Sequence, residues 1–306
     1  MTAIAAAPGA ASFLELKGGG RLAYSEYGDP AGKPVFFFHG WPASRLQGFG
    51  PGEPGEKMGV RIISPDRPGV GLSTYAEGRS LLDWPPLVRA LADHLGLDKF
   101  HVMGLSGGGP YSFATTWALA DRVIATAVVS GAPPMPPGMD DSTLLPVYRV
   151  MLRIHRRHPT FIRNLFQVVR PVAGLSLPPW TRPFLWRMAA PADAEALSAP
   201  GIFEKHFATY QESWRTSGFG VASDAEVYPQ DWGFRVEDIQ TPIQLWHGKD
   251  DRSFSWKLAE SLASRLPRCT THFVEGEGHY SLSIRYWKQI LESLFANEES
   301  SNSNSL

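Results

Sequence analysis

Short runs of apolar residues, separated by glycine-rich and polar turns, occupy the first third of the chain and are typical of β-strands. They cover residues 12–17, 21–27, 34–39 and 61–65. The glycine triplet between the first two runs predicts a hairpin turn. The third run, Pro-Val-Phe-Phe-Phe-His, is continuously apolar, which indicates a strand that is buried on both faces of a sheet.

Strand and helix patterns then alternate along the chain. Helical patterns cover residues 81–95 and 109–120, and strand patterns cover residues 100–105 and 123–130. The alternation returns near the C-terminus, with strands at 242–247 and 270–274 and helices at 255–266 and 284–295. Such alternation predicts an α/β fold with a mostly parallel sheet that is flanked by helices.

The region between these two stretches lacks the alternation. It begins with a proline-rich run after residue 130 and continues with aromatic helical stretches that are broken by prolines. An interruption between two strands of one sheet indicates an insertion. We therefore expect an α/β core formed by residues 1–132 and 236–296, a helical insertion at 133–235, and a flexible Ser-, Asn- and Glu-rich tail at 297–306.

The composition of the 306 residues is that of a globular protein, with 43% hydrophobic and 19% charged residues. Lys plus Arg number 29 and Asp plus Glu number 30, so the net charge of −1 does not favour nucleic acid as a partner. The single cysteine, Cys269, excludes an intrachain disulfide and favours a cytoplasmic location. No apolar run reaches the ~18 residues that a membrane helix needs, so we expect no stable membrane insertion.

A candidate nucleophile lies where the strand at 100–105 meets the following helix. The run Gly104-Leu105-Ser106-Gly107-Gly108 has the G-x-S-x-G pattern of a sharp strand-to-helix turn, which exposes the serine hydroxyl above the sheet. One alternative is a glycine-rich turn with an incidental serine. A phosphate-binding loop is disfavoured because the Lys-Ser/Thr pair that such loops require is missing.

A serine nucleophile needs a base, and the base needs an orienting acid. Asp250 and Asp251 follow the strand at 242–247, and His279 follows the strand at 270–274. Strand ends at one edge of a parallel sheet lie close together, where open α/β sheets build their sites. The chain order Ser, Asp, His is also that of the α/β-hydrolase triad.

Over nearly its whole length the chain resembles the lid-bearing serine hydrolases of the α/β-hydrolase fold. The resemblance rests on His39-Gly40-Trp41 after the third strand, on the run from Asp66 to Ser73 after the fourth, and on the turn, acid and histidine described above. Members of this family include esterases, lactonases, C–C bond hydrolases, proline iminopeptidases, epoxide hydrolases, dehalogenases and cofactor-free haloperoxidases. The fold alone therefore does not define the substrate.

The resemblance implies a role for five residues. Ser106 is the expected nucleophile, His279 the base and Asp251 the acid, since the family acid lies three residues after the glycine that ends its strand. The backbone N–H groups of Trp41 and Gly107 are the expected oxyanion hole. The implied chemistry requires no cofactor and no metal.

Two departures from family patterns narrow the chemistry. Epoxide hydrolases and haloalkane dehalogenases carry Asp where this chain has Ser106, and proline iminopeptidases usually carry His-Gly-Gly-Pro-Gly where it has His39-Gly40-Trp41-Pro42-Ala43. We expect a hydrolase of small-molecule carboxylic esters, thioesters or lactones that forms an acyl-enzyme. The alternatives are a C–C bond hydrolase, a haloperoxidase or perhydrolase with the same triad, and a slow-turnover small-molecule receptor on the same scaffold.

The stretch at 145–190 contains eight arginines, many aromatic residues and no acidic residue. A membrane-surface helix can have this character, but we favour a lid whose apolar face covers the site and whose arginines pair with acids elsewhere or face water. We expect Trp180, Phe184 and Trp186 to line a pocket for a hydrophobic part of the substrate. The sequence does not define an oligomeric state.

Four further polar residues have structural interpretations. His39 is expected to support the oxyanion turn, and Asp66 to shape the glycine-rich loop that follows it. His155 and His158 are expected on a solvated helix face, because no carboxylate lies near them in the sequence to complete a metal site.

Overall fold

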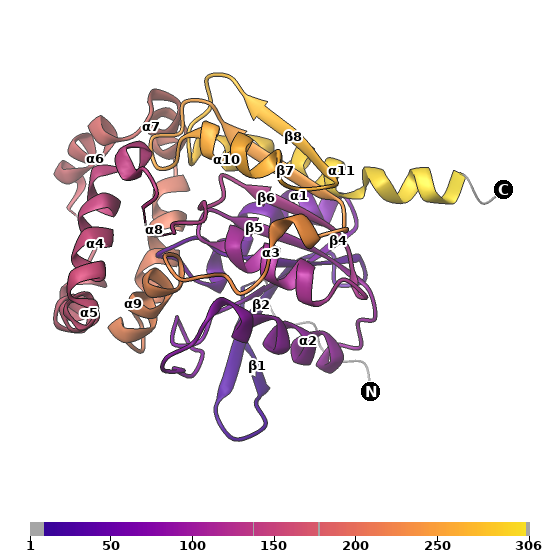
Figure 1. Ribbon diagram of the computed structural model, residues 1–306, viewed down its shortest axis with the longest axis horizontal. Helices are drawn as coiled ribbons and strands as arrows, with labels where there is room; N and C mark the ends of the chain where they lie inside the picture. The colour runs from indigo at the N-terminus through magenta and orange to yellow at the C-terminus, as the bar shows by residue number, and fades with distance from the viewer. Residues whose placement is uncertain (1–8, 137, 177, 304–306) are drawn as a thin grey trace.

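The computed structural model describes residues 9–136, 138–176 and 178–303. Its centre is an eight-stranded sheet with the order β1-β2-β4-β3-β5-β6-β7-β8 (Figure 1). The strands are β1 (Ser12–Glu15), β2 (Arg21–Gly28), β3 (Lys33–Phe38), β4 (Val60–Pro65), β5 (Phe100–Leu105), β6 (Val123–Val129), β7 (Ile243–Gly248) and β8 (Cys269–Val274). The first two pairings are antiparallel and all the others are parallel, which confirms the predicted mostly parallel α/β sheet.

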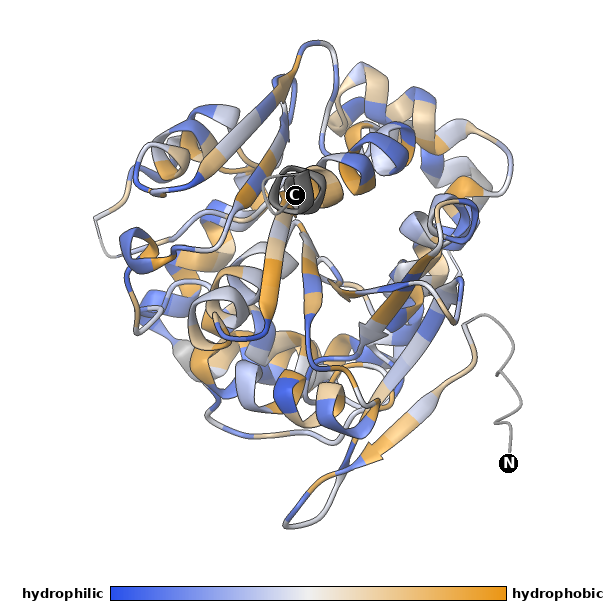
Figure 2. Ribbon diagram, turned by 90° about the vertical axis from the view of Figure 1, so that its right-hand side faces the viewer, coloured by the Kyte–Doolittle hydropathy of each residue, from blue (hydrophilic) through white to orange (hydrophobic). Residues whose placement is uncertain are grey.

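Helices cover both faces of this sheet. They are α1 (Phe49–Lys57), α2 (Trp84–His94), α3 (Gly108–Ala118), α10 (Trp256–Ala263) and α11 (Ser281–Ser303). Phe36 and Phe38 of β3 belong to the apolar cluster with α2, α3 and α10, whereas Val35 and Phe37 belong to the cluster with α11. Alternate residues of one strand point to opposite faces, so the apolar run in β3 is buried on both sides, as its sequence predicts. Figure 2 shows hydrophobic segments in several strands and mixed colouring along the helices.

Between β6 and β7, which pair with each other, the chain leaves the sheet and forms a group of helices beside it (Figure 1). We call residues 133–235 the inserted segment. Its helices are α4 (Pro146–Arg157), α5 (Pro159–Ala173), α6 (Arg182–Met188), α7 (Pro191–Ser198), α8 (Ile202–Ser213) and α9 (Gly218–Val227).

The C-terminal helix reaches into the segment that we predict to be a flexible tail. The predicted tail covers residues 297–306, and α11 continues as helix to Ser303, while residues 304–306 lie outside the described residues. Adding residues to an existing helix does not require a new nucleus, so a polar sequence can extend α11 without forming a core.

Candidate active site

The predicted nucleophile lies on a strained turn between β5 and α3. Ser106 has a φ of 52°, in the left-handed region that residues with a side chain rarely adopt. A β-carbon at Gly104 would lie 2.1 Å from the Ser112 hydroxyl oxygen, and one at Gly108 would lie 2.0 Å from the Phe38 carbonyl oxygen. Both glycines of the G-x-S-x-G pattern are therefore required by close packing around the turn.

Ser106, His279 and Asp251 form one hydrogen-bonded chain. The His279 Nε2 atom lies 2.9 Å from Ser106 Oγ, and its Nδ1 atom lies 2.7 Å from Asp251 Oδ2. All three residues are buried. Asp250 is exposed, and its backbone N–H donates to the Glu277 carbonyl. The structure thus brings the three predicted residues together and selects Asp251 over its neighbour.

The electrostatics of this hydrogen-bonded chain favour a basic His279 and an ionised Asp251. Burial by itself lowers the pKa of the His279 imidazole, but the charge of Asp251, its hydrogen bond and the charge of Asp193 raise the pKa above 6.5. Burial by itself raises the pKa of Asp251, but contacts with His279 and His247 lower it well below its usual range. Asp251 therefore keeps its negative charge beside His279.

His247, near the end of β7, also contacts Asp251, and no pattern in the sequence predicts this contact. Its Nε2 atom lies 3.2 Å from Asp251 Oδ2 and 3.0 Å from the Phe254 carbonyl oxygen. The other oxygen of Asp251 accepts from the backbone N–H groups of Ser253 and Phe254, at 2.7 and 3.0 Å. The carboxylate that faces His279 is therefore held on both oxygens.

The loop that carries Trp41 is held by a buried guanidinium. Arg67 donates through Nη1 to the His39 carbonyl at 2.6 Å and through Nη2 to the Gly40 carbonyl at 2.8 Å. The Trp41 indole N–H donates to the Val221 carbonyl in α9. Neither the Trp41 nor the Gly107 backbone N–H donates a hydrogen bond to another described residue, so both can serve a ligand.

The hydroxyl of Tyr228, a residue of the inserted segment, lies next to Gly107 and the Trp41 backbone. Tyr228 follows α9, is 7% exposed, and its hydroxyl has no hydrogen-bond partner among the described residues. A β-carbon at Gly107 would lie 2.3 Å from this hydroxyl and 3.1 Å from the Trp41 backbone nitrogen. No pattern in the sequence predicts this position of Tyr228, because it depends on the fold of the inserted segment.

Two cavities adjoin Ser106. The larger has a volume of about 610 Å³ and is also lined by His279. Helices α5, α6 and α8 of the inserted segment supply much of its wall, through Val172, Trp186, Phe203, Phe207 and Tyr210. A mostly apolar wall beside a polar reaction centre suits a substrate with a hydrophobic portion.

The aromatic residues expected in the pocket are placed differently by the structure. Trp186 lines the larger cavity and contacts Phe203 edge to face at 5.4 Å. Trp180 and Phe184 are 79% and 74% exposed and line neither cavity, so the prediction for these two residues is wrong. Trp180 lies in the turn before α6, and Phe184 lies in α6 itself. On a turn or helix this short, periodicity cannot define which side faces the core.

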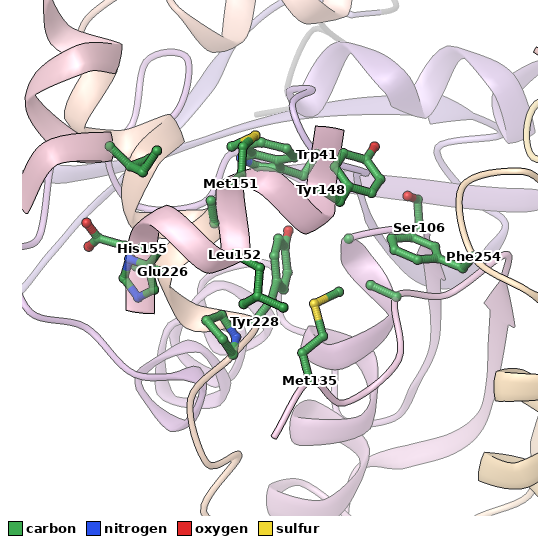
Figure 3. A pocket seen from close by; sticks show the side chains of 15 residues that line it. Trp41, Ser106, Met135, Tyr148, Met151, Leu152, His155, Glu226, Tyr228 and Phe254 are labelled. Atoms are coloured by element: carbon green, nitrogen blue, oxygen red, sulfur yellow. The ribbon is translucent and has the colours of Figure 1, made fainter. Parts of the chain in front are cut away.

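The smaller cavity, of about 60 Å³, is narrow and apolar near Ser106. Met135, Tyr148 and Leu152 line it, and His155 and Glu226 lie at the end away from the serine (Figure 3). His155 is therefore not on a solvated helix face as predicted, and burial lowers its pKa. The described residues contain no cluster of side chains that could hold a metal ion.

Several arginines of the inserted segment pair with acids, as expected. Arg153 pairs with Asp141, Arg163 with Glu226 and Arg182 with Glu204, at 2.9, 2.7 and 2.9 Å. Among the described helices, none is both long and apolar enough to cross a bilayer.

Comparisons with known proteins agree with this geometry. A bifunctional esterase/perhydrolase of Acinetobacter calcoaceticus is 28% identical over 83% of this chain and 87% of its own length. An uncharacterized hydrolase of Bacillus subtilis is 37% identical, but the match spans only 34% of this chain and 36% of that protein. The crystal structure of a bromoperoxidase from Bacillus anthracis superposes with a TM-score of 0.69 at 18% identity, covering 94% of this chain and 98% of the other, and shows the same fold. Residues 35–290 match the alpha/beta hydrolase family, and the chain belongs to that family.

Proposed function

We propose that this protein is a serine hydrolase that cleaves a carboxylic ester, thioester or lactone through an acyl-enzyme. The observation that carries the proposal is the chain of contacts in which His279 reaches Ser106 at 2.9 Å and Asp251 at 2.7 Å. A serine hydroxyl with an aligned imidazole, itself oriented by a carboxylate, is the arrangement that activates serine toward a carbonyl carbon.

In the first half-reaction, Ser106 Oγ attacks the carbonyl carbon while His279 Nε2 takes the hydroxyl proton. The negative oxygen of the tetrahedral intermediate accepts hydrogen bonds from the Trp41 and Gly107 N–H groups, each worth about 3–4 kcal/mol in comparable sites. When the intermediate collapses, the C–O bond to the alcohol breaks and His279 returns the proton to the leaving oxygen. In the second half-reaction, His279 deprotonates a water that attacks the acyl carbon, and the acid leaves as Ser106 regains its proton.

The hydroxyl of Tyr228 supports a third contact with the substrate. It is buried, adjacent to Gly107 and without a hydrogen-bond partner in the described part of the chain. A buried hydroxyl without a partner costs free energy, and a carbonyl oxygen in the oxyanion hole would supply that partner.

The two cavities support a substrate with two parts of different size. The larger cavity beside Ser106 and His279 accommodates the bulky hydrophobic arm, and the smaller accommodates a short arm. We propose that the inserted segment acts as a lid, because α5, α6 and α8 wall the larger cavity and exclude water from it.

The absence of a second cysteine supports a cytoplasmic location.

A second reaction of the same acyl-enzyme is favoured by one relative, which is named a bifunctional esterase/perhydrolase. Hydrogen peroxide in place of water would attack the acyl carbon and release a peracid, with the proton passing through His279 as before.

A fluorophosphonate probe and a panel of p-nitrophenyl esters test the proposal. We expect a single label on Ser106 and turnover that Ser106→Ala abolishes. Labelling that persists in Ser106→Ala removes Ser106 as the nucleophile. Tight binding of esters with turnover at the background rate would identify a receptor instead, and peracid formation in added peroxide would establish the second reaction.

A further inference from the structure

Asp193, in helix α7 of the inserted segment, is only 2% exposed and points at the loop of the catalytic histidine. Its carboxylate accepts three hydrogen bonds from consecutive backbone N–H groups: His279 at 3.0 Å, Tyr280 at 2.8 Å and Ser281 at 2.8 Å. One side chain, 86 residues away in sequence, thus binds the backbone of the proposed base itself.

These N–H groups lie at the beginning of α11, which starts at Ser281. The first N–H groups of a helix have no partner within the helix, and the positive end of the helix dipole favours a carboxylate. Such a partner commonly comes from the residue just before the helix. Here the Ser281 hydroxyl instead accepts from the Gly278 N–H, and the cap is supplied by a different part of the chain.

The loop is shaped to receive this carboxylate. A β-carbon at Gly278 would lie 2.5 Å from both oxygens and from the carboxylate carbon of Asp193. Only glycine leaves the room that the contact needs. The glycine before His279 and the carboxylate in α7 therefore form one fitted contact, although neither belongs to the Ser–His–Asp chain.

We propose that Asp193 is a positioning residue that makes the alignment of His279 depend on the docking of α7. The imidazole must reach Ser106 through one nitrogen and Asp251 through the other, so a rotation or shift of the His279 backbone breaks one contact or both. A displacement of about 1 Å in a reacting group can cost about 100-fold in rate. An inserted segment that lifts α7 away from the core would release the histidine at the same time.

Asp193→Asn is the sharpest test, because asparagine has nearly the same shape. Its oxygen can still accept from Tyr280 and Ser281, while its NH₂ group faces the His279 N–H, where two donors meet. The kinetic readout rests on the proposed esterase function. We expect kcat for a p-nitrophenyl ester to fall about 10–100-fold with KM changed less than about threefold, because the substrate cavity is intact.

Glu195→Gln is the matched control. Glu195 lies on the same helix and also reaches α11, through a 3.0 Å contact with Arg285, but its side chain is 79% exposed and it does not touch the histidine loop. We expect its kcat to stay within about twofold of the wild type, because exposed ion pairs contribute little. An equal loss in both variants would mean that α7 acts only through general stability and would overturn the proposal.

Amide hydrogen exchange measures how firmly Asp193 holds the histidine loop, and this measurement does not depend on turnover. We expect faster exchange at residues 278–283 in Asp193→Asn, unchanged exchange there in Glu195→Gln, and unchanged exchange in β5 for both. Equal exchange at residues 278–283 in wild type and Asp193→Asn overturns the proposed role of Asp193, even if the protein proves to be no esterase. A wild type without turnover but with the expected exchange pattern instead overturns the proposed function alone.

Gly278→Ala is the second variant, for use if Asp193→Asn does not fold. The added methyl group would displace the carboxylate while leaving Asp193 itself unchanged. We expect the same fall in kcat and the same faster exchange as in Asp193→Asn. Wild-type kcat in a folded Gly278→Ala protein would contradict the proposal.

Discussion

The Asp224 carboxylate in α9 lies 2.7 Å from Nε of Arg67, and the same guanidinium holds the carbonyl groups of His39 and Gly40. Arg79 and the Tyr111 hydroxyl also contact Asp224. The inserted segment therefore anchors the loop that presents the Trp41 N–H. Asp193 likewise contacts the backbone of His279. One carboxylate of the inserted segment thus supports the Trp41 loop and another supports the His279 loop of the proposed active site.

Removing the charge of Asp224 should affect both stability and rate. Asp224→Asn leaves Arg67 and Arg79 buried without their counter-charge, and breaking a buried pair in this way costs about 3–5 kcal/mol. We expect a lower Tm by calorimetry and a lower kcat at temperatures where the protein is still folded. Glu237→Gln, which breaks an exposed pair with Arg265, should leave Tm and kcat within error of the wild type. A wild-type Tm in Asp224→Asn would contradict the anchoring role of Asp224.

The same carboxylate gives a pH dependence of stability with a definite sign. Burial alone would raise the pKa of Asp224, but the charges of Arg67 and Arg79 outweigh it and lower the pKa from 3.8 to about 2. A lowered pKa in the folded state stabilises the protein above pH 3.8, and that contribution is lost as the pH falls toward 2. In urea titrations, wild type should therefore lose more stability over this interval than Asp224→Asn, and parallel curves would count against the shift.

The pH dependence of the rate tests the pair of His279 and Asp251. His279 must be neutral to act as a base, and its raised pKa places the acid limb of kcat/KM above pH 6.5. Asp251→Asn removes the charge that raises this pKa, so the limb should move to lower pH. We expect kcat to fall by about 10⁴, as in protease triads. Asp250→Asn is the control and should change kcat by less than about tenfold. If kcat falls more in Asp250→Asn than in Asp251→Asn, Asp250 is the acid.

The residues of the Ser–His–Asp chain could be predicted because each has a local signal. Ser106 lies in a glycine-rich turn after a clear strand, and Asp251 and His279 follow strands that end at the same edge of the sheet. The parallel topology brings these strand ends together. The choice of Asp251 over Asp250 additionally needs the resemblance to the family, because both residues follow the same strand.

The supporting residues have no such signal. Asp193 and Asp224 are acidic residues on helices of ordinary composition, and their partners lie 86 and 157 residues away in sequence. Which helix face meets the core depends on how six helices pack beside the sheet, and the sequence pattern of the inserted segment does not fix that packing. The same cause explains why Trp180 and Phe184 are exposed although their composition predicts a pocket wall.

Tyr228→Phe tests the hydroxyl next to Gly107. The change removes one oxygen and keeps the ring. Folding should be unaffected or slightly favoured, because the buried hydroxyl has no hydrogen-bond partner to lose among the residues that the structure describes. If the hydroxyl donates to the developing oxyanion, kcat should fall by about 10²–10³. Met135→Leu, in the wall of the same small cavity, should have a much smaller effect. Wild-type kcat in Tyr228→Phe would leave the oxyanion hole with its two backbone donors.

The corrected assignment of the aromatic residues gives a test of substrate selection. Trp186 lines the larger cavity, whereas Trp180 on the same short stretch is 79% exposed. A methylene group that contacts the cavity wall is worth about 0.8 kcal/mol, so Trp186→Ala should lower kcat/KM by up to about fourfold for each methylene that reaches it. The loss should therefore grow with the length of the hydrophobic arm in a series of p-nitrophenyl esters from acetate to octanoate. In Trp180→Ala, kcat/KM should equal the wild-type value for every ester in the series. A loss of equal size for every ester in Trp186→Ala would mean that this residue supports the fold of the inserted segment and does not select the substrate.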